Sequence, residues 1–212
     1  MNKLCNYKKE TLLGFLIALS MIAFGQQSFF CFDKISARQA PFIEQKFNSE
    51  TKIVKYRISI SDDYIPNGKE LKNLLSQPLI FNRPDTTFTP YPQVMYFFLS
   101  KDSTVKLIEY AWDSRNSDQN LNAILAQKNK ESNRSDEYNK KFESILENLK
   151  KILGIPSKGV SNPVLVEKEG RSWTERISEW HNDNVNVELI MIWSGKTKSI
   201  GTYKIVAKIY WT

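Results

Sequence analysis

A helical pattern of apolar side chains covers residues 135–153. Large apolar residues recur there at steps of three and four positions, which gathers them into one broad stripe over about five turns of a helix. The stripe consists of Tyr138, Phe142, Ile145, Leu146, Leu149, Ile152 and Leu153. Ser135 is the predicted N-cap, and Asp136 and Glu137 behind it complement the positive start of the helix. Gly154 supplies the residue that ends it.

After this helix the apolar period changes to two, which predicts antiparallel strands. The predicted strands cover residues 163–168, 172–180, 185–193 and 203–211. Apolar rows follow the last two strands, with Val185, Val187, Leu189, Met191 and Trp193 on one and Tyr203, Ile205, Ala207, Ile209 and Trp211 on the other. The helical stripe needs an apolar partner, so we expect the helix to pack on these rows.

Residues 41–112 also carry strand patterns, with a proline-rich interruption. Apolar alternation predicts a half-buried strand over residues 54–60, and Leu71, Leu74 and Leu75 then form a short helical face. Proline donates no hydrogen bond to a strand ladder, so the segment with Pro78, Pro84, Pro90 and Pro92 is predicted to be a loop. The strands Val94–Leu99 and Val105–Trp112 then form a hairpin.

These elements predict an α+β protein with a mostly antiparallel β-sheet. The long amphipathic helix (135–153) packs on the C-terminal strand meander, and the N-terminal half is β-rich. The predicted divisions are a signal peptide (1–25), a flexible N-terminal segment (26–40), a β-rich half (41–112), a polar linker with a short helix (113–134) and the helix with its antiparallel strands (135–212). A single domain over residues 41–212 is the alternative.

The N-terminal residues carry an export pattern. Lys3, Lys8 and Lys9 precede an apolar run from Leu12 to Phe24, and Ala23-Phe24-Gly25 places small residues at the −3 and −1 positions of a cleavage site. We therefore expect a cleaved signal peptide and an exported protein, periplasmic or secreted. The alternative is a membrane anchor formed by residues 11–32, because apolar character continues past the polar triplet that follows Gly25.

Composition narrows the choice of partner. The chain has 212 residues, with 30 Lys and Arg against 23 Asp and Glu, for a net charge of +7. The positive excess is spread along the chain, so we predict no nucleic-acid partner. Cys5 leaves with the signal peptide and Cys31 then has no partner within the chain, so no internal disulfide is predicted.

Candidate catalytic residues are few. His181 is the one histidine of the chain and lies in a predicted turn. Glu175 and Glu179 share a strand but lie about 13 Å apart, too far for a glycosidase pair. No zinc, nucleotide or nucleophile motif occurs, so we predict no catalytic residue, cofactor or metal ligand. The alternative function is an extracytoplasmic hydrolase that uses carboxylates and His181.

The face of the sheet away from the helix is the candidate binding surface. One helix covers one side only, so this face is either covered by residues 41–112 or contacts a partner. Trp180 shares parity with the polar Arg176 and Ser178 and is therefore expected to point away from the core. The predicted partner-binding residues are Trp180, Tyr210, Ile190, Ile192 and Val206. The sequence thus favours a non-enzymatic module that binds an unknown protein or glycan.

Overall fold

The computed structural model describes residues 28–114, 122, 126, 130–159, 162–168, 171–182, 184–194 and 202–211. The chain divides into two compact units, Met1–Cys31 and Phe32–Thr212, and the fold given below is that of the second unit. The export pattern and most of the predicted 113–134 linker lie outside the described residues. Within the described residues, no helix has the length and hydrophobicity needed to cross a membrane.

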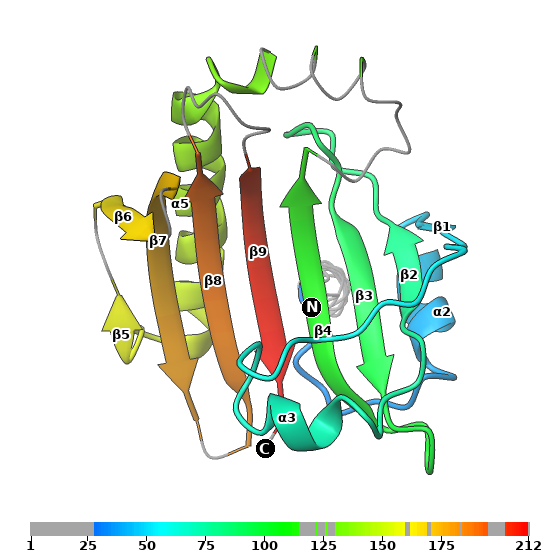
Figure 1. Cartoon of the computed structure of the whole chain (residues 1–212). Coiled ribbons are helices and arrows are strands. Elements are labelled where there is room, and N and C mark those ends of the chain that lie inside the picture. Colours follow the sequence, from blue (N-terminus) through cyan, green and yellow to red (C-terminus); the bar gives the residue numbers. More distant parts are fainter. Residues whose placement is uncertain are drawn as a thin grey trace, which may run out of the picture. The chain divides into compact units, whose positions relative to one another are not determined.

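The described residues form one antiparallel sheet of nine strands, which confirms the predicted α+β class (Figure 1). In spatial order the strands are β1 (Glu50–Thr51), β2 (Leu79–Asn82), β3 (Gln93–Phe98), β4 (Val105–Asp113), β9 (Tyr203–Tyr210), β8 (Asn186–Trp193), β7 (Arg171–His181) and β5 (Lys158–Gly159). A further strand, β6 (Val164–Lys168), also pairs with β7. The predicted C-terminal meander is therefore present as β7, β8 and β9.

The long helix α5 (Ser135–Leu153) packs against β8 and β9, as the sequence predicts. It ends at Gly154, whose φ of +83° leaves the helical region. Its buried residues are Tyr138, Phe142, Ile145, Leu146 and Leu149. We call the side of the sheet that α5 covers the helix face, and the opposite side the second face. Figure 1 views the sheet from the second face, with α5 behind the strands.

The N-terminal half extends this same sheet edge to edge. Strand β4 pairs with β9 from Leu107 opposite Tyr210 to Asp113 opposite Lys204. One apolar row consequently crosses the helix face through Val187, Ile209, Ile108 and Tyr96. One part of the core therefore lies along the helix face, where α5 covers the C-terminal strands and the short helix α2 (Ala40–Gln45) lies behind the N-terminal strands (Figure 1).

Buried ion pairs hold the surrounding segments on the helix face. Glu44 of α2 pairs with Arg83, and the hydroxyl of Tyr96 donates to the same carboxylate at 2.5 Å. Lys141 of α5 pairs with Asp85 at 2.5 Å, which ties the helix to the loop after β2. These charges are enclosed and mutually paired, so they serve packing and orientation.

Two predictions for the N-terminal half are wrong. Residues 54–60 form no strand, because pairing with β2 ends after Thr51 and the amide of Gln77 instead bonds the main chain of Ile58. The apolar alternation there belongs to an irregular segment, bent at Lys55 and Tyr56, that crosses in front of the sheet (Figure 1). Strand β2 occupies part of the predicted loop, because Pro78 and Pro84 flank the strand without interrupting it.

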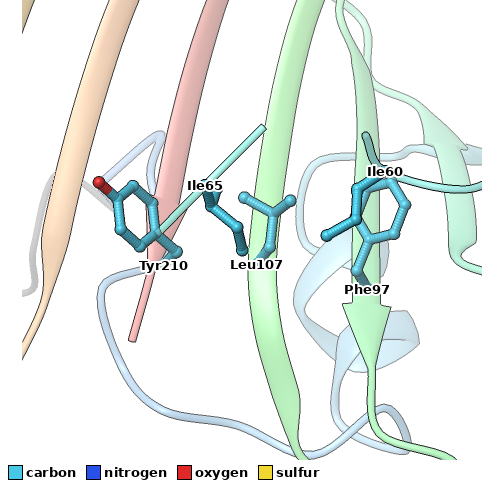
Figure 2. Packing of buried hydrophobic residues seen from close by; sticks show 5 residues of the cluster. All are labelled: Ile60, Ile65, Phe97, Leu107 and Tyr210. Atoms are coloured by element: carbon cyan, nitrogen blue, oxygen red, sulfur yellow. The ribbon is translucent and has the colours of Figure 1, made fainter. Parts of the chain in front are cut away.

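The segment over residues 58–75 covers part of the second face. It contains the short helix α3 (Gly68–Leu71), which overlaps the predicted helical face of Leu71, Leu74 and Leu75 only at Leu71. Figure 2 shows Ile60 and Ile65 of this segment packed against side chains of β3, β4 and β9. The cluster consists of Ile60, Ile65, Phe97, Leu107 and Tyr210.

Candidate functional site

Trp180 lies on the helix face, so the expectation that it points away from the core is wrong. It pairs with Val187 in the sheet, and 1% of its surface is exposed. Its indole Nε1 donates to the carbonyl oxygen of Gly154 at 2.9 Å. Trp180 is therefore enclosed beneath the end of α5 and cannot serve as an exposed anchor.

The polar neighbours of Trp180 explain the error. Arg176 and Ser178 share its parity and are themselves buried on the helix face. The guanidinium of Arg176 lies over the ring of Phe142 at 4.4 Å and donates to Glu143 at 2.5 Å. A charged partner on α5 thus allows a polar residue to face the helix. The polarity of a residue in β7 therefore does not indicate to which face of the sheet its side chain points.

Tyr210 lies on the second face, as its parity predicts, but it is covered. Only 7% of its surface is exposed, and Ile65 lies beside it between Tyr210 and Leu107 (Figure 2). Burial raises the pKa of the Tyr210 hydroxyl. For this part of the second face, the structure favours the alternative in which residues 41–112 provide the cover.

Ile190, Ile192 and Val206 also lie on the second face. Val206 is buried in β9, whereas Ile190 and Ile192 of β8 are half-buried, as is Ile177 opposite Ile190. We call Ile177, Ile190 and Ile192 the isoleucine band. No described helix lies in front of β7 and β8 on this side (Figure 1). The band is therefore the apolar part of the second face that described elements leave open.

A row of charged residues borders the isoleucine band. Pairing across β7, β8, β9 and β4 places Glu179, Glu188, Lys208 and Glu109 side by side, and we call them the charged row. Lys208 Nζ lies 2.8 Å from a carboxylate oxygen of Glu188 and donates to the carbonyl oxygen of Tyr64 at 3.0 Å. The hydroxyl of Tyr64 in turn donates to Glu109.

The buried end of the charged row holds a perturbed carboxyl. Burial raises the pKa of Glu109, and the hydrogen bond from Tyr64 opposes this change only in part. Burial and the neighbouring carboxylate likewise raise the pKa of Tyr64. This end of the row is enclosed beneath the 58–75 segment. The raised pKa of Glu109 therefore results from its burial in the packed protein and does not indicate a site that a substrate can reach.

His181 lies at the exposed end of the charged row. Its Nδ1 is 3.0 Å from Asn186 Oδ1, and its Nε2 is 3.2 Å from a carboxylate oxygen of Glu179. Glu188 lies opposite Glu179 in the sheet, so a second carboxylate follows in the next strand of the charged row. Each carboxylate also faces a lysine, since Lys158 Nζ lies 3.2 Å from Glu179. The arrangement is an exposed ion-paired rim rather than an enclosed acid–base pair.

Metal ligation is not favoured by this arrangement. Among the described residues, no group of three or more His, Cys, Asp or Glu side chains is placed to hold a metal ion. The carboxylates of Glu179 and Glu188 each pair with a lysine ammonium group, which already neutralises their charge.

Sequence analysis missed a groove at the opposite end of the sheet. It has a volume of about 660 Å³ and lies between Thr51–Arg57 and Leu75–Ile80. Ile53 and Tyr56 of its first wall are 88% and 64% exposed. The predicted strand over residues 54–60 implied no groove here, because a paired strand would lie directly against its neighbour. We call it the edge groove.

The second face of β7 and β8 therefore offers an apolar band beside a polar, ion-paired rim. The edge groove offers a separate concave surface next to β2. No protein-family model matches the chain, and neither does any curated protein or solved structure.

Proposed function

We propose that this protein is a non-enzymatic binding module that holds a protein partner against the second face of β7 and β8. The supporting observation is the isoleucine band, which is half-buried and has no described helix over it. An apolar centre beside a polar rim is the usual anatomy of a protein interface. Aliphatic side chains form the open centre, which favours a protein over the alternative occupant, a glycan.

The proposed place of action is outside the cytoplasm, either in the periplasm or after secretion. Support comes from the basic residues, apolar run and small residues that precede Gln26. N-terminal sequencing of the exported protein tests this proposal, with Gln26 expected as the first residue. Recovery of Met1 would instead favour the membrane anchor formed by residues 11–32.

Substitution of Ile190 tests the binding surface. Photo-crosslinking from position 190 in a host envelope extract identifies the partner, whose affinity is then measured with purified proteins. Ile190→Gln is expected to weaken binding by about 30-fold, as for a central interface residue. The matched control is Ile152→Gln on the exposed side of α5, which replaces an isoleucine far from the band.

The two variants also separate binding from folding. We expect Ile190→Gln to keep a cooperative unfolding transition, because the side chain is only half-buried. Equal affinities for Ile190→Gln and Ile152→Gln would refute the surface. A purified glycan that competes with the partner in the same assay would identify the alternative occupant.

A hydrolase is the second candidate function, and its support is that Glu179, which pairs with Glu188 in the sheet, lies 3.2 Å from the imidazole of His181. It requires turnover that is lost in His181→Ala. The matched substitution Asn186→Ala removes the other partner of the imidazole while leaving the ring in place. Turnover that survives in both variants would exclude His181 as its base.

A further inference from the structure

The two walls of the edge groove differ in length between two fixed points. At one end, Lys52 N donates to the carbonyl oxygen of Ile80 at 2.8 Å. At the other end, the side-chain amide of Gln77 bonds both the N–H and the C=O of Ile58. Residues 53–57 join these points on the first wall, whereas only two residues join them on the second. The longer wall is bent and bows away from the shorter one, which leaves the hollow of about 660 Å³.

The two walls also differ in chemistry. The first wall carries the cations, and none of the described residues that line the groove is acidic. Lys55 and Arg57 are exposed, and within the described part of the chain neither forms an ion pair. The second wall has no charged side chain and consists of Leu75, Ser76, Gln77, Pro78, Leu79 and Ile80. A ligand in the groove therefore meets cations on one side and mainly aliphatic side chains on the other.

A molecule with an anionic head and one acyl chain matches both walls. The acyl chain removes water from the aliphatic wall, which favours binding by the hydrophobic effect. The head group complements the charges of Lys55 and Arg57. A small hydrophilic anion would leave the aliphatic wall in water, and a neutral hydrocarbon would leave both cations without a partner. The volume also lies within the range of about 300–1,000 Å³ that is usual for small-molecule sites.

We propose that the edge groove binds an anionic amphiphile with a single acyl chain. The acyl chain lies along the second wall, from Leu75 to Ile80, and the head group faces Lys55 and Arg57. The exposed side chain of Ile53 adds apolar surface on the first wall. This site is separate from the isoleucine band, because β2 and β7 lie near opposite ends of the sheet order.

The first test measures binding of a fluorescent fatty acid to the full chain. The probe is dansylamino-undecanoate, used below the concentration at which it forms micelles, and its emission is expected to rise on binding. We expect a Kd below about 100 µM. The matched probe is the primary amide of the same molecule, which keeps the chain and loses the charge. It is expected to bind at least tenfold more weakly, and equal affinities of acid and amide would overturn the proposal.

Competition against this probe tests the acyl chain. Octanoate, decanoate and dodecanoate share one head group and differ by two methylene groups at each step. Complete burial of two methylene groups gives about fifteenfold in affinity, so we expect a rise of at least about fivefold for each step. A hexaglutamate peptide carries more charge and no acyl chain, and we expect it not to displace the probe. Affinity that does not depend on chain length would overturn the proposal. Displacement by hexaglutamate as strong as that by dodecanoate would instead identify an acidic peptide as the occupant.

Charge substitutions test the location of the site. The double variant Lys55→Glu and Arg57→Glu is expected to lose at least tenfold in affinity for dodecanoate. The control makes the same change in net charge at two exposed lysines of α5, Lys140→Glu and Lys151→Glu. Urea unfolding of both double variants is expected to stay cooperative, because all four side chains are exposed or extend into solvent. Similar losses of affinity in the two double variants would show that only net charge matters, which would refute the edge groove as the site.

Discussion

The indole of Trp180 is enclosed between β7 and the end of α5, and it donates to the carbonyl oxygen of Gly154. We predict that Trp180→Ala lowers the free energy of unfolding by about 3–5 kcal/mol, because it removes a large buried side chain. Trp180→Phe retains most of the packing, so its smaller cost reports mainly the lost hydrogen bond. Urea unfolding measures both, and an unchanged midpoint for Trp180→Ala would contradict the buried position.

Asp85 and Glu109 are expected to change the stability of the folded protein in opposite directions as the pH rises. Burial alone would raise the pKa of Asp85, but hydrogen bonds from Lys141, Thr87 and Trp112 outweigh it and lower that pKa. The ionised form is favoured by folding, so Asp85 stabilises the protein above its usual pKa of 3.8. This contribution is lost as the pH falls through the lower folded pKa.

For Glu109 the sign is reversed. Burial raises its pKa in the folded protein, so its contribution to stability is full below its usual pKa of 4.5 and is lost as the pH rises through the folded value. Relative to wild type, Glu109→Gln should therefore gain stability between acidic and neutral pH, whereas Asp85→Asn should lose it. Chemical denaturation across this range measures both differences. Parallel curves for the two variants would contradict these assignments.

At the scale of single elements, Gly154 ends α5 in a conformation that other residues rarely adopt. Its φ is +83° with ψ at −160°, although nothing lies within 4 Å of an added Cβ. We predict that Gly154→Ala costs about 1–3 kcal/mol from backbone strain alone. Gly159→Ala is the control, because the nearest atom to its Cβ would be Pro156 Cγ at 3.4 Å, an ordinary contact. Equal melting temperatures for the two variants would refute strain at Gly154.

The elements that the sequence predicts correctly are those in which apolar residues repeat with a regular period along a short stretch of chain. The seven-residue stripe of α5 and the rows of β8 and β9 repeat often enough to fix both type and position. Residues 54–60 have the same alternation, but pairing needs a neighbouring edge, and β2 leaves them after Thr51. Period alone does not distinguish an irregular segment that crosses a sheet from a strand within it.

The candidate site was predictable only in part, for a related reason. Parity correctly placed Ile190, Ile192, Val206 and Tyr210 on the second face. The cover over Tyr210 comes from a segment about 145 residues earlier in the sequence, and the neighbours of His181 depend on strand pairing. Such long-range contacts leave no local trace in a single sequence.

For the whole molecule, the pairing of β4 with β9 joins both halves into one sheet. We predict that the halves open together in native-state hydrogen exchange, so amides of β3 and β8 share one global free energy. Leu189→Ala in β8 should lower protection in β3 as much as in β8, by about 2–5 kcal/mol. A loss confined to β8 would show that the halves unfold separately.

The position of β9 also bears on how the chain is assembled during synthesis. β9 follows all the other described strands in sequence, yet it lies between β4 and β8 in the middle of the sheet. During synthesis, the edge of β4 that pairs with β9 therefore has no partner until α5 and four further strands have been synthesised. An unpaired apolar edge invites association with other chains. A nascent chain of this protein would depend on chaperones, or on delayed folding, until its last described strand is available.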